Sequence, residues 1–278
     1  LVTGVQTCAL PIYQCGLGLN MKPKIAVLVV AYNAQDTLKA VLDRIPESFI
    51  PEISTVLVCD DASTDATTAV VNEYMVRSTL PITVVTHPIN RGYGGNQKFG
   101  YQWAIDHGVD IVILLHGDGQ YAPEELPRIA VPLISGSADV VFGSRMLNRR
   151  NARKGGMPLY KYVGNICLTT LQNWLVGTSL SEWHSGYRAY RVSSLRGVNF
   201  QQNSDEFDFD TQIILQMIET QQRITEIEIP TFYGEEISHV NSVKYGLQIL
   251  GHTIRFRFAR SRQRRSEEHT SELQSRVD

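Results

Sequence analysis

The sequence predicts an α/β fold in which helices cover both faces of a mainly parallel sheet. Three observations carry this prediction. Strand-like aliphatic runs alternate with helix-like patterns along most of the chain, which is the order expected of βαβ units. The first run, Ile25–Ala31, is uninterrupted and rich in β-branched residues, as in a strand buried on both faces. Polar residues directly follow four of the runs, at the sheet edge where α/β proteins bind ligands.

The first half of the chain supplies five strands separated by segments with helical spacing. Leu38, Val41 and Leu42 mark the apolar face of the first helix. Pro123 and the two glutamates after it open another helix, because proline suits the first helical position and acidic side chains suit the first turn. The expected strands are Ile25–Ala31, 56–59, 82–85, 111–115 and 140–142.

The second half of the chain begins with a basic, glycine-containing stretch at residues 146–157. A helix is expected next, because five apolar residues recur at helical spacing. Further strands are expected at 187–192 and 224–229, with a helix at 213–218 between them. The five apolar residues of the first helix are Tyr160, Val163, Cys167, Leu171 and Trp174.

Residues 246–264 predict a basic amphipathic helix at the C-terminal side of the domain. Leu247, Leu250, Ile254 and Phe258 recur every three or four residues, and arginines lie between and after them. Two interpretations stay open. The apolar stripe packs on the domain, which we favour, or the helix lies on an anionic bilayer.

The composition excludes several classes of protein. The 278 residues include 26 Lys and Arg and 28 Asp and Glu, so bulk charge would not hold a nucleic acid. Ile25–Ala31 is the longest uncharged aliphatic run, far shorter than the roughly 20 residues that cross a bilayer. The four cysteines form no metal or disulfide pattern, and we expect Cys59 and Cys167 to be small buried residues. A cytoplasmic globular protein is expected.

The two ends of the chain resemble translations of the two strands of a sequencing adapter. Residues 2–12 read VTGVQTCALPI and residues 265–275 read RSEEHTSELQS. One DNA string can encode the first segment while its reverse complement encodes the second. We therefore expect non-native segments at 1–20 and 265–278, one globular domain at 21–245, and the basic helix at 246–264.

Side chains suited to a nucleotide gather after the predicted strands. Carboxylates at these positions can accept hydrogen bonds from a base or a ribose. Asp118 has glycine on either side, which permits close approach of a large ligand, and its carboxylate could hold a divalent cation between phosphate oxygens. A β-turn with a solvated aspartate is the alternative. The residues at the four strand ends are Tyr32, Asn33, Asp60, Asp61, His116, Asp118 and Arg145.

Residues 90–96 (NRGYGGN) predict a glycine-rich turn before a helix, similar to loops that approach phosphates. Asn96 in this segment is a candidate for substrate binding. The segment lacks the GK[ST] ending of a P-loop and the G-x-G-x-x-G spacing of dinucleotide-binding folds, so both of those site types are excluded. Arg145 and Arg188 are candidates for holding phosphate groups, which arginine can do with two parallel hydrogen bonds.

Six ordered motifs resemble the family 2 glycosyltransferases, which have the GT-A fold, a Rossmann-like arrangement. EFDFD (206–210) and EIPTFY (228–233) further resemble the branch of dolichyl- or polyprenyl-phosphate mannose synthases. The resemblance covers residues 24 to about 245. The six motifs are VVAYN (29–33), CDDASTD (59–65), NRGYGGN (90–96), HGDGQYAPEEL (116–126), GSR (143–145) and HSGYRAYR (184–191).

The resemblance implies inverting transfer of a sugar from a nucleotide diphosphate sugar, either a GDP- or a UDP-sugar. It implies that Asp60 and Asp61 contact the nucleoside, with Tyr32 and Asn33 beside the base. Gln120 would lie near the pyrophosphate. These five residues and Asn96, Arg145 and Arg188 are the expected substrate-binding set.

The resemblance also implies a cation, Mg²⁺ or Mn²⁺, held by Asp118 as the metal-binding carboxylate of a D-x-D motif. The sequence departs from that motif at His116, which stands where the first Asp is expected. Imidazole suits Mn²⁺ better than Mg²⁺. His116 is therefore a second metal ligand, a residue that orients Asp118, or a residue that faces the donor ribose.

The catalytic candidates are Asp118, Glu182 and Asp205. A hydroxyl acceptor needs a general base, whereas a lipid phosphate is already an anion. Glu182 is the first choice as base, because related enzymes carry an acidic residue shortly before S-G. Asp205 is a further acid/base candidate, as are Asp208 and Asp210, for which helix N-terminal charge is the alternative.

A polyprenyl-phosphate-type acceptor is favoured by the sequence. Two alternatives stay open, transfer to a hydroxyl of a cell-surface polysaccharide or lipid-linked glycan, and a non-catalytic sugar-nucleotide binder. A sugar nucleotidylyltransferase is disfavoured because residues 31–36 form no basic glycine-rich loop. We expect the protein in the cytoplasm, with peripheral association at the inner face of the membrane, and no nucleic-acid partner.

Overall fold

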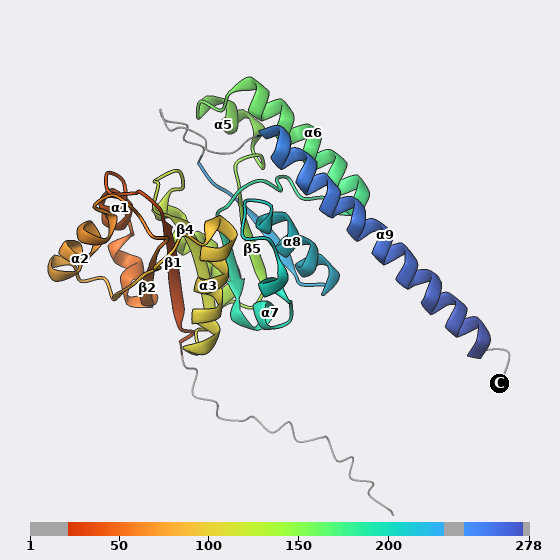
Figure 1. Cartoon of the computed structure of the whole chain (residues 1–278), viewed down its shortest axis with the longest axis horizontal. Coiled ribbons are helices and arrows are strands. Elements are labelled where there is room, and N and C mark those ends of the chain that lie inside the picture. The colour runs from red at the N-terminus through yellow and green to blue at the C-terminus, as the bar shows by residue number, and fades with distance from the viewer. Residues whose placement is uncertain (1–21, 231–241, 275–278) are drawn as a thin grey trace, which may run out of the picture.

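The computed structural model describes residues 22–230 and 242–274, which form one seven-stranded sheet flanked by helices (Figure 1). The strand order across the sheet is β3-β2-β1-β4-β6-β5-β7. Every strand expected from the sequence is present. The strands are β1 (Ile25–Ala31), β2 (Ile53–Asp60), β3 (Ile82–Thr86), β4 (Ile111–His116), β5 (Val140–Ser144), β6 (Arg188–Arg191) and β7 (Ile224–Glu228).

One strand, β6, runs against its two neighbours. The pairs β1–β2, β1–β4, β2–β3 and β5–β7 are parallel, whereas β6 pairs antiparallel with both β4 and β5. This confirms the mainly parallel sheet. Because β6 is reversed, its first residue, Arg188, lies opposite Leu114 of β4 and Phe142 of β5. The segment that leads into β6 therefore reaches the edge at which the parallel strands end.

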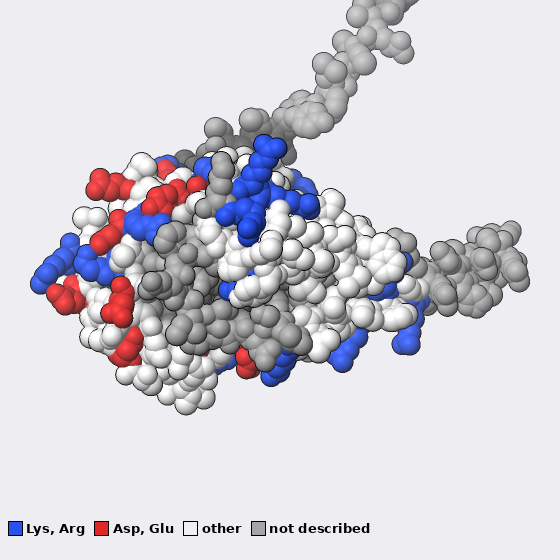
Figure 2. All heavy atoms as spheres, turned by 90° about the horizontal axis from the view of Figure 1, so that it is seen from above, with Lys and Arg blue, Asp and Glu red and all other residues white. Residues whose placement is uncertain are grey.

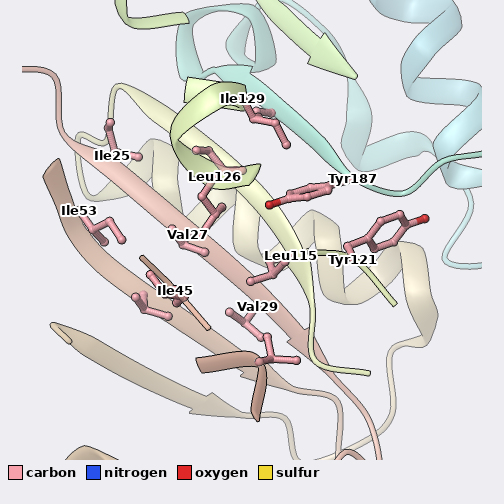
Figure 3. Close-up of a cluster of buried hydrophobic side chains, with 14 of the residues drawn as sticks. Ile25, Val27, Val29, Ile45, Ile53, Leu115, Tyr121, Leu126, Ile129 and Tyr187 are labelled. Atoms are coloured by element: carbon pink, nitrogen blue, oxygen red, sulfur yellow. The ribbon is translucent and has the colours of Figure 1, made fainter. Parts of the chain in front are cut away.

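Helices cover both faces of the sheet, as predicted. On one face Val27 and Val29 of β1 pack in a core with Leu126 of α4 (Figure 3). On the other face Leu28 packs in a second core with Tyr101 of α3. This alternation is the period of two of a strand buried on both faces. The helices are α1 (Leu38–Asp43), α2 (Thr67–Arg77), α3 (Gly92–Asp106), α4 (Leu126–Ile134), α5 (Arg149–Lys154), α6 (Leu159–Val176), α7 (Val192–Arg196), α8 (Phe209–Glu219) and α9 (Ser242–Gln274), with 3₁₀ helices η1 (Glu47–Glu52), η2 (Pro123–Glu125) and η3 (Phe200–Gln202).

The glycine-rich segment is the start of a helix, which corrects the expectation of a turn before one. Helix α3 begins at Gly92, so Gly94 and Gly95 lie in its first turns. A Cβ atom on Gly94 would lie 2.5 Å from the carbonyl oxygen of Ser204 and 2.7 Å from Cβ of Phe209. The missing side chain thus lets this turn pack directly on a neighbouring backbone. Close packing is sufficient to explain this glycine.

Two expectations about apolar residues in the outer helices are wrong. Cys167, expected to be buried, is exposed on α6. Leu247, Ile254 and Phe258 are also exposed, so the apolar stripe of α9 does not pack on the domain. Helix α9 instead lies along α6 and α8 through its other side, where Ile249 is buried (Figure 1). Among the described residues, none of the helices is both long and apolar enough to cross a membrane.

Candidate active site

The loops that follow β1 and β2 are tied together by hydrogen bonds. The backbone N–H of Asn33 donates to Ser63 Oγ at 2.9 Å, and Asn33 Oδ1 accepts from the backbone N–H of Thr64 at 2.9 Å. Asn33 has φ of 49°, a left-handed conformation that asparagine adopts more readily than most residues. Tyr32 beside it is exposed. Tyr32 and Asn33 therefore lie next to the loop after β2, and their contact with a base stays a prediction.

Asp60, the last residue of β2, has a buried carboxylate that its own loop satisfies. Its Oδ1 accepts hydrogen bonds from the backbone N–H of Ser63, at 3.1 Å, and from the Ser63 hydroxyl. Its Oδ2 accepts from the Thr68 hydroxyl. These bonds shape the entry into α2. They favour a supporting role for Asp60, and its contact with a nucleoside stays a prediction.

Asp61 and Asn96 fix the start of α3 beside the end of β2. Asp61 Oδ1 accepts from the backbone N–H of Arg91 at 2.7 Å, and burial raises the pKa of this carboxyl despite that bond. Asn96 is buried, its Nδ2 donates to the Cys59 carbonyl at 3.0 Å, and its Oδ1 lies 3.2 Å from Nε2 of His87. The substrate contacts expected of Asp61 and Asn96 stay predictions.

The loop after β4 carries Asp118 on an anchored backbone. The N–H of Gly117 donates to the Val30 carbonyl at 2.9 Å, so the bonding between β4 and β1 continues into the loop. Asp118 is half-buried, and its Oδ1 accepts from the backbone N–H of Gln120 at 3.0 Å. Gly119, with φ of 79°, supplies the left-handed turn. An accessible carboxylate on a fixed loop suits a cation that also binds phosphate oxygens.

His116, the last residue of β4, is enclosed by aromatic rings. Its ring centroid lies 5.5 Å from that of Tyr93 and 4.9 Å from that of Tyr121. A Cβ atom on Gly186 would lie 2.7 Å from Cε1 of His116, so the imidazole also packs on the backbone before β6. Burial lowers the pKa of His116, which keeps the ring neutral at pH 7. This packing favours an orienting role, and metal ligation by His116 stays a prediction.

A buried network of Tyr93, Asp210 and Arg188 lies beside His116. Tyr93 Oη donates to Asp210 Oδ2 at 3.0 Å, and Arg188 Nη2 lies 3.5 Å from the same oxygen. The guanidinium also donates to the carbonyl oxygens of Ser185, Asp210 and Trp183, at 2.8, 2.8 and 3.1 Å. Arg188 is 1% exposed. Protein groups thus engage its donors, and these contacts do not support the expected phosphate contact.

Glu182 is buried and held by Arg145. Its Oε2 accepts from the backbone N–H of Arg145 at 2.7 Å, and its Oε1 accepts from Arg145 Nε at 3.0 Å and pairs with Nη2. Asn165 of α6 donates to Oε1 at 2.8 Å. Burial acts to raise the pKa of Glu182, but Arg145 outweighs it and holds the pKa below its usual value. A carboxylate held in this way is a weak proton acceptor, so the contacts favour positioning of Arg145, and the general-base role stays a prediction.

The residues after Glu182 bring His184 against α9. His184 Nδ1 lies 3.2 Å from Tyr245 Oη, and its carbonyl oxygen accepts from Arg145 Nη2 at 3.0 Å. Its Nε2 is buried without a hydrogen-bond partner among the described residues. Burial lowers the pKa of His184 to about 4, so the ring is neutral at pH 7.

The expected acid/base candidates beyond residue 200 all have partners within the protein. Asp205 is exposed, its Oδ1 lies 2.6 Å from Nζ of Lys98, and its carbonyl oxygen accepts from the N–H of Gly94 at 2.7 Å. Asp208 pairs with His252 of α9 at 2.8 Å. Asp205 therefore lies beside the first turn of α3, and its catalytic role stays a prediction.

Asp118 and Arg145 both lie near enough to His116 to affect its pKa, and Arg145 pairs with Glu182, so these residues gather where β4 and β5 end. Sequence reasoning did not single out three residues that organise this place. Tyr93 and Tyr121 lie within quoted motifs, and Tyr121 Oη accepts from the N–H of Gly186 at 2.7 Å, which joins the loop after β4 to the segment before β6. Asn165 carried no recognisable signal. The three residues are Tyr93, Tyr121 and Asn165.

Few side chains of the candidate site could bind a cation. Within residues 22–230 and 242–274 no group of three or more His, Cys, Asp or Glu side chains could hold a metal ion. A site built from Asp118 and substrate phosphate oxygens fits Mg²⁺, which binds through one or two carboxylates together with phosphates and water. The residues present therefore fit a cation that arrives with its nucleotide.

Comparisons with known proteins agree with this geometry. A sequence profile described as Glycosyl transferase family 2 matches residues 26–198. The UDP-N-acetylglucosamine–dolichyl-phosphate N-acetylglucosaminyltransferase of Methanococcus voltae is 26% identical over 243 residues, which cover 83% of this chain and 95% of that protein. The undecaprenyl-phosphate mannosyltransferase of Micrococcus luteus is 29% identical over 222 residues, which cover 77% of this chain and 85% of the relative.

Solved structures show the same fold. Glucosyl-3-phosphoglycerate synthase from Mycobacterium tuberculosis, in complex with Mn²⁺ and UDP-glucose, aligns with a TM-score of 0.64 at 16% sequence identity. The alignment covers 85% of this chain and 80% of that structure. The expected GT-A architecture is thereby confirmed.

Proposed function

We propose, from the premise that this chain belongs to glycosyl transferase family 2, that it moves a hexose from a nucleotide diphosphate sugar to a polyprenyl-phosphate-type acceptor. Membership of the family rests on the profile match over residues 26–198, which spans the strand ends of the site. The names of the two relatives, which specify dolichyl phosphate and undecaprenyl phosphate, support a lipid phosphate acceptor. The donor is a GDP- or UDP-sugar, and the transfer inverts the anomeric carbon.

The donor binds across the ends of β1, β2 and β4. Tyr32 is exposed there and offers its ring to a base, while Asn33 is fixed by the neighbouring loop. Asp60 and Asp61 shape the end of β2 through their bonds to the loop after it and to the start of α3. Gln120 follows Asp118 on the same loop and lies within reach of the diphosphate.

Asp118 is the residue that would hold a Mg²⁺ or Mn²⁺ ion beside the diphosphate. Such a cation neutralises the charge that develops on the departing nucleoside diphosphate. His116, neutral and packed between Tyr93 and Tyr121, fixes the base of the loop that presents Asp118. Structures of the synthase from M. tuberculosis that contain Mn²⁺ with UDP or UDP-glucose support a cation that accompanies the nucleotide.

Arg145 receives the phosphate of the acceptor. Glu182 and the His184 carbonyl hold its guanidinium in place just after the end of β5. A phosphate monoester is already ionised at neutral pH and attacks without a general base. The lowered pKa of Glu182, which makes it a weak proton acceptor, is therefore compatible with this acceptor.

The observation that carries the proposal is the half-buried Asp118 on an anchored loop, within the span of the family match. The test is an assay of labelled GDP- and UDP-sugars with Mn²⁺ or Mg²⁺ and a short-chain polyprenyl phosphate. The expected product partitions into organic solvent and releases its sugar in mild acid. A product that stays in water, or no product from any donor, would contradict it.

Transfer to a hydroxyl of a cell-surface polysaccharide or lipid-linked glycan is the second candidate. It needs a general base, and Glu182 and Asp205 are the carboxylates predicted for it. A labelled sugar that stays joined to other sugars after mild acid treatment would favour this candidate over the lipid phosphate. With either acceptor the protein works beside a membrane, and we propose a peripheral location on its cytoplasmic face.

A further inference from the structure

Helix α6 buries polar residues together with Val176 on its inner side and carries a row of apolar residues on its outer side. Thr169 and Gln172 are buried, and Asn173 donates to the Leu180 carbonyl at 2.7 Å. The opposite side carries five exposed residues, at the spacing of one helix face. The two aromatic residues among them are 68% and 74% exposed. This face, called the α6 stripe below, consists of Tyr160, Val163, Cys167, Leu171 and Trp174.

An outer face that meets water would carry polar side chains, so the α6 stripe indicates apolar surroundings. Its aromatic residues lie near the two ends of the helix, and Val163 and Leu171 lie between them. Tyrosine and tryptophan favour the boundary between lipid tails and water, because one end of the ring system is apolar and the other is polar. The stripe matches a helix that lies flat in a bilayer interface.

The charged residues that α5, α6 and the first part of α9 carry are all basic. Helices α5 and α6 contain five Lys and Arg, α9 contains five more up to Arg262, and none of these stretches contains Asp or Glu. In Figure 2 most of the visible acidic side chains lie over the left part of the molecule, while lysine and arginine side chains border the uncharged surface at the right. The ten basic residues are Arg149, Arg150, Arg153, Lys154, Lys161, Lys244, Arg255, Arg257, Arg260 and Arg262.

We propose that the α6 stripe docks on an anionic lipid bilayer, with the basic residues of α5 and α9 near the headgroups. Two apolar surfaces could cover the stripe, a lipid bilayer and a second copy of this chain, and charge distinguishes them. A second copy of this chain would bring a cationic surface against another cationic surface, which is unfavourable. An anionic leaflet attracts the same residues.

Helix α6 links this surface to the candidate site, and here the inference rests on the proposed function. Asn165 on its inner side donates to Glu182, which holds Arg145. A helix with its side chains is about 10 Å across. Docking through the outer side of α6 therefore holds Arg145 near the headgroup layer, where the phosphate of a lipid acceptor lies.

The test measures binding to vesicles that contain no polyprenyl phosphate, so it is independent of turnover. Replacement of two stripe residues (Leu171→Ser with Trp174→Ser) should weaken binding to phosphatidylglycerol vesicles about 100-fold, because two large apolar side chains lose their lipid contact. The matched control removes exposed apolar residues from α2 (Met75→Ser with Val76→Ser) and should bind like the unchanged protein. Melting temperatures of both variants confirm folding.

Charge is tested by Arg149→Gln with Arg150→Gln, which should weaken vesicle binding about 25-fold. The control, Lys39→Gln with Arg77→Gln, neutralises two exposed cations on α1 and α2 and should have no effect. Binding should also fall steeply with salt and be weak on phosphatidylcholine vesicles. Brominated lipids should quench Trp174, and Trp174→Phe should abolish that quenching.

Equal binding of the stripe variant and its control would overturn the proposal. So would a dimer that the stripe variant converts to a monomer without any vesicle binding, since the occupant would then be a second copy. The proposed function is judged separately, because a short-chain soluble acceptor needs no membrane. The stripe variant should glycosylate that acceptor at the unchanged rate.

Discussion

Two segments that meet at the carboxyl edge of the sheet differ in how accessible their charged side chains are. In the loop after β4, residues 116–120, Asp118 is half-buried and bonded to the backbone of its own loop. In the segment before β6, residues 181–186, Glu182 and His184 are enclosed, and Arg145 pairs with Glu182. A carboxylate at such an edge is available to a ligand only where the protein leaves it accessible. We therefore expect the first segment to meet substrate and the second to support it.

The largest expected effect separates activity from stability at Asp118. Asp118→Asn should lower turnover on the order of 10³-fold, because the amide no longer balances the charge of a cation at the diphosphate. Its melting temperature should move by less than about 2 °C, since the side chain is half-buried and makes one local hydrogen bond. Asp106→Asn, an exposed change at the far end of α3, is the control. Loss of stability with turnover intact would reverse the assignment of this loop.

In contrast to Asp118→Asn, Glu182→Gln should mainly lower the stability of the fold. Removal of one partner from a buried ion pair costs about 3–5 kcal/mol, which urea unfolding at pH 7 measures. Because the folded pKa of Glu182 lies below its usual value, its stabilisation is full at neutral pH and is lost as the pH falls through that lowered value. The variant should therefore lack this pH-dependent part of the free energy of unfolding. An unchanged unfolding midpoint would refute the supporting role; Glu52→Gln at an exposed pair is the control.

His184 should make the supporting segment sensitive to acid. Its pKa of about 4 in the folded chain compares with about 6.5 when unfolded, so the unfolded chain binds the proton first. Stability should therefore decrease from pH 6.5 to pH 4, by about 3 kcal/mol. His184→Gln should flatten this part of the pH profile, whereas His107→Gln on the exposed end of α3 should not. Identical profiles for all three proteins would show that His184 does not titrate as the structure requires.

The smallest expected effect lies where the two segments touch. Gly186→Ala would put Cβ 2.7 Å from Cε1 of His116 and 2.8 Å from Oη of Tyr93, so both rings must shift. We expect a loss of about 1–2 kcal/mol together with reduced turnover, because the displaced ring carries the loop of Asp118 with it. Gly164→Ala on α6 meets no atom within 4 Å and should gain up to about 1 kcal/mol of stability. Equal behaviour of the two variants would show that the contact is not functional.

The sheet could be predicted from the sequence because a strand buried on both faces leaves an unmistakable aliphatic run. Ile25–Ala31 is such a run, and its side chains alternate between two cores. The positions of Asp118 and Arg145 at strand ends followed from the same runs. Local patterns of this kind are set by residues near one another in the chain.

Other features depend on contacts between distant segments, which periodicity does not reveal. Helical spacing predicted the α6 and α9 stripes, but spacing does not say which side of a helix faces the protein. The glycines at the start of α3 predicted a turn, but in the structure they allow the helix to pack against the backbone of Ser204. Arg188 had the chemistry of a phosphate ligand, yet its guanidinium is engaged by carbonyl groups and Asp210. Burial and partners decide the role of such residues.

The reversed strand β6 has a consequence for how the polypeptide is made. Strand β5 ends at Ser144, but its pairing partners, β6 and β7, begin only at Arg188 and Ile224. While the ribosome is still extending the chain, β5 has emerged without a neighbour to bond, and the growing sheet ends at β4. Completion of the last three strands thus waits for late synthesis, because these pairings join residues far apart along the chain. Until then an unpaired strand edge is open to other nascent chains, and cellular chaperones have a defined window in which to cover it.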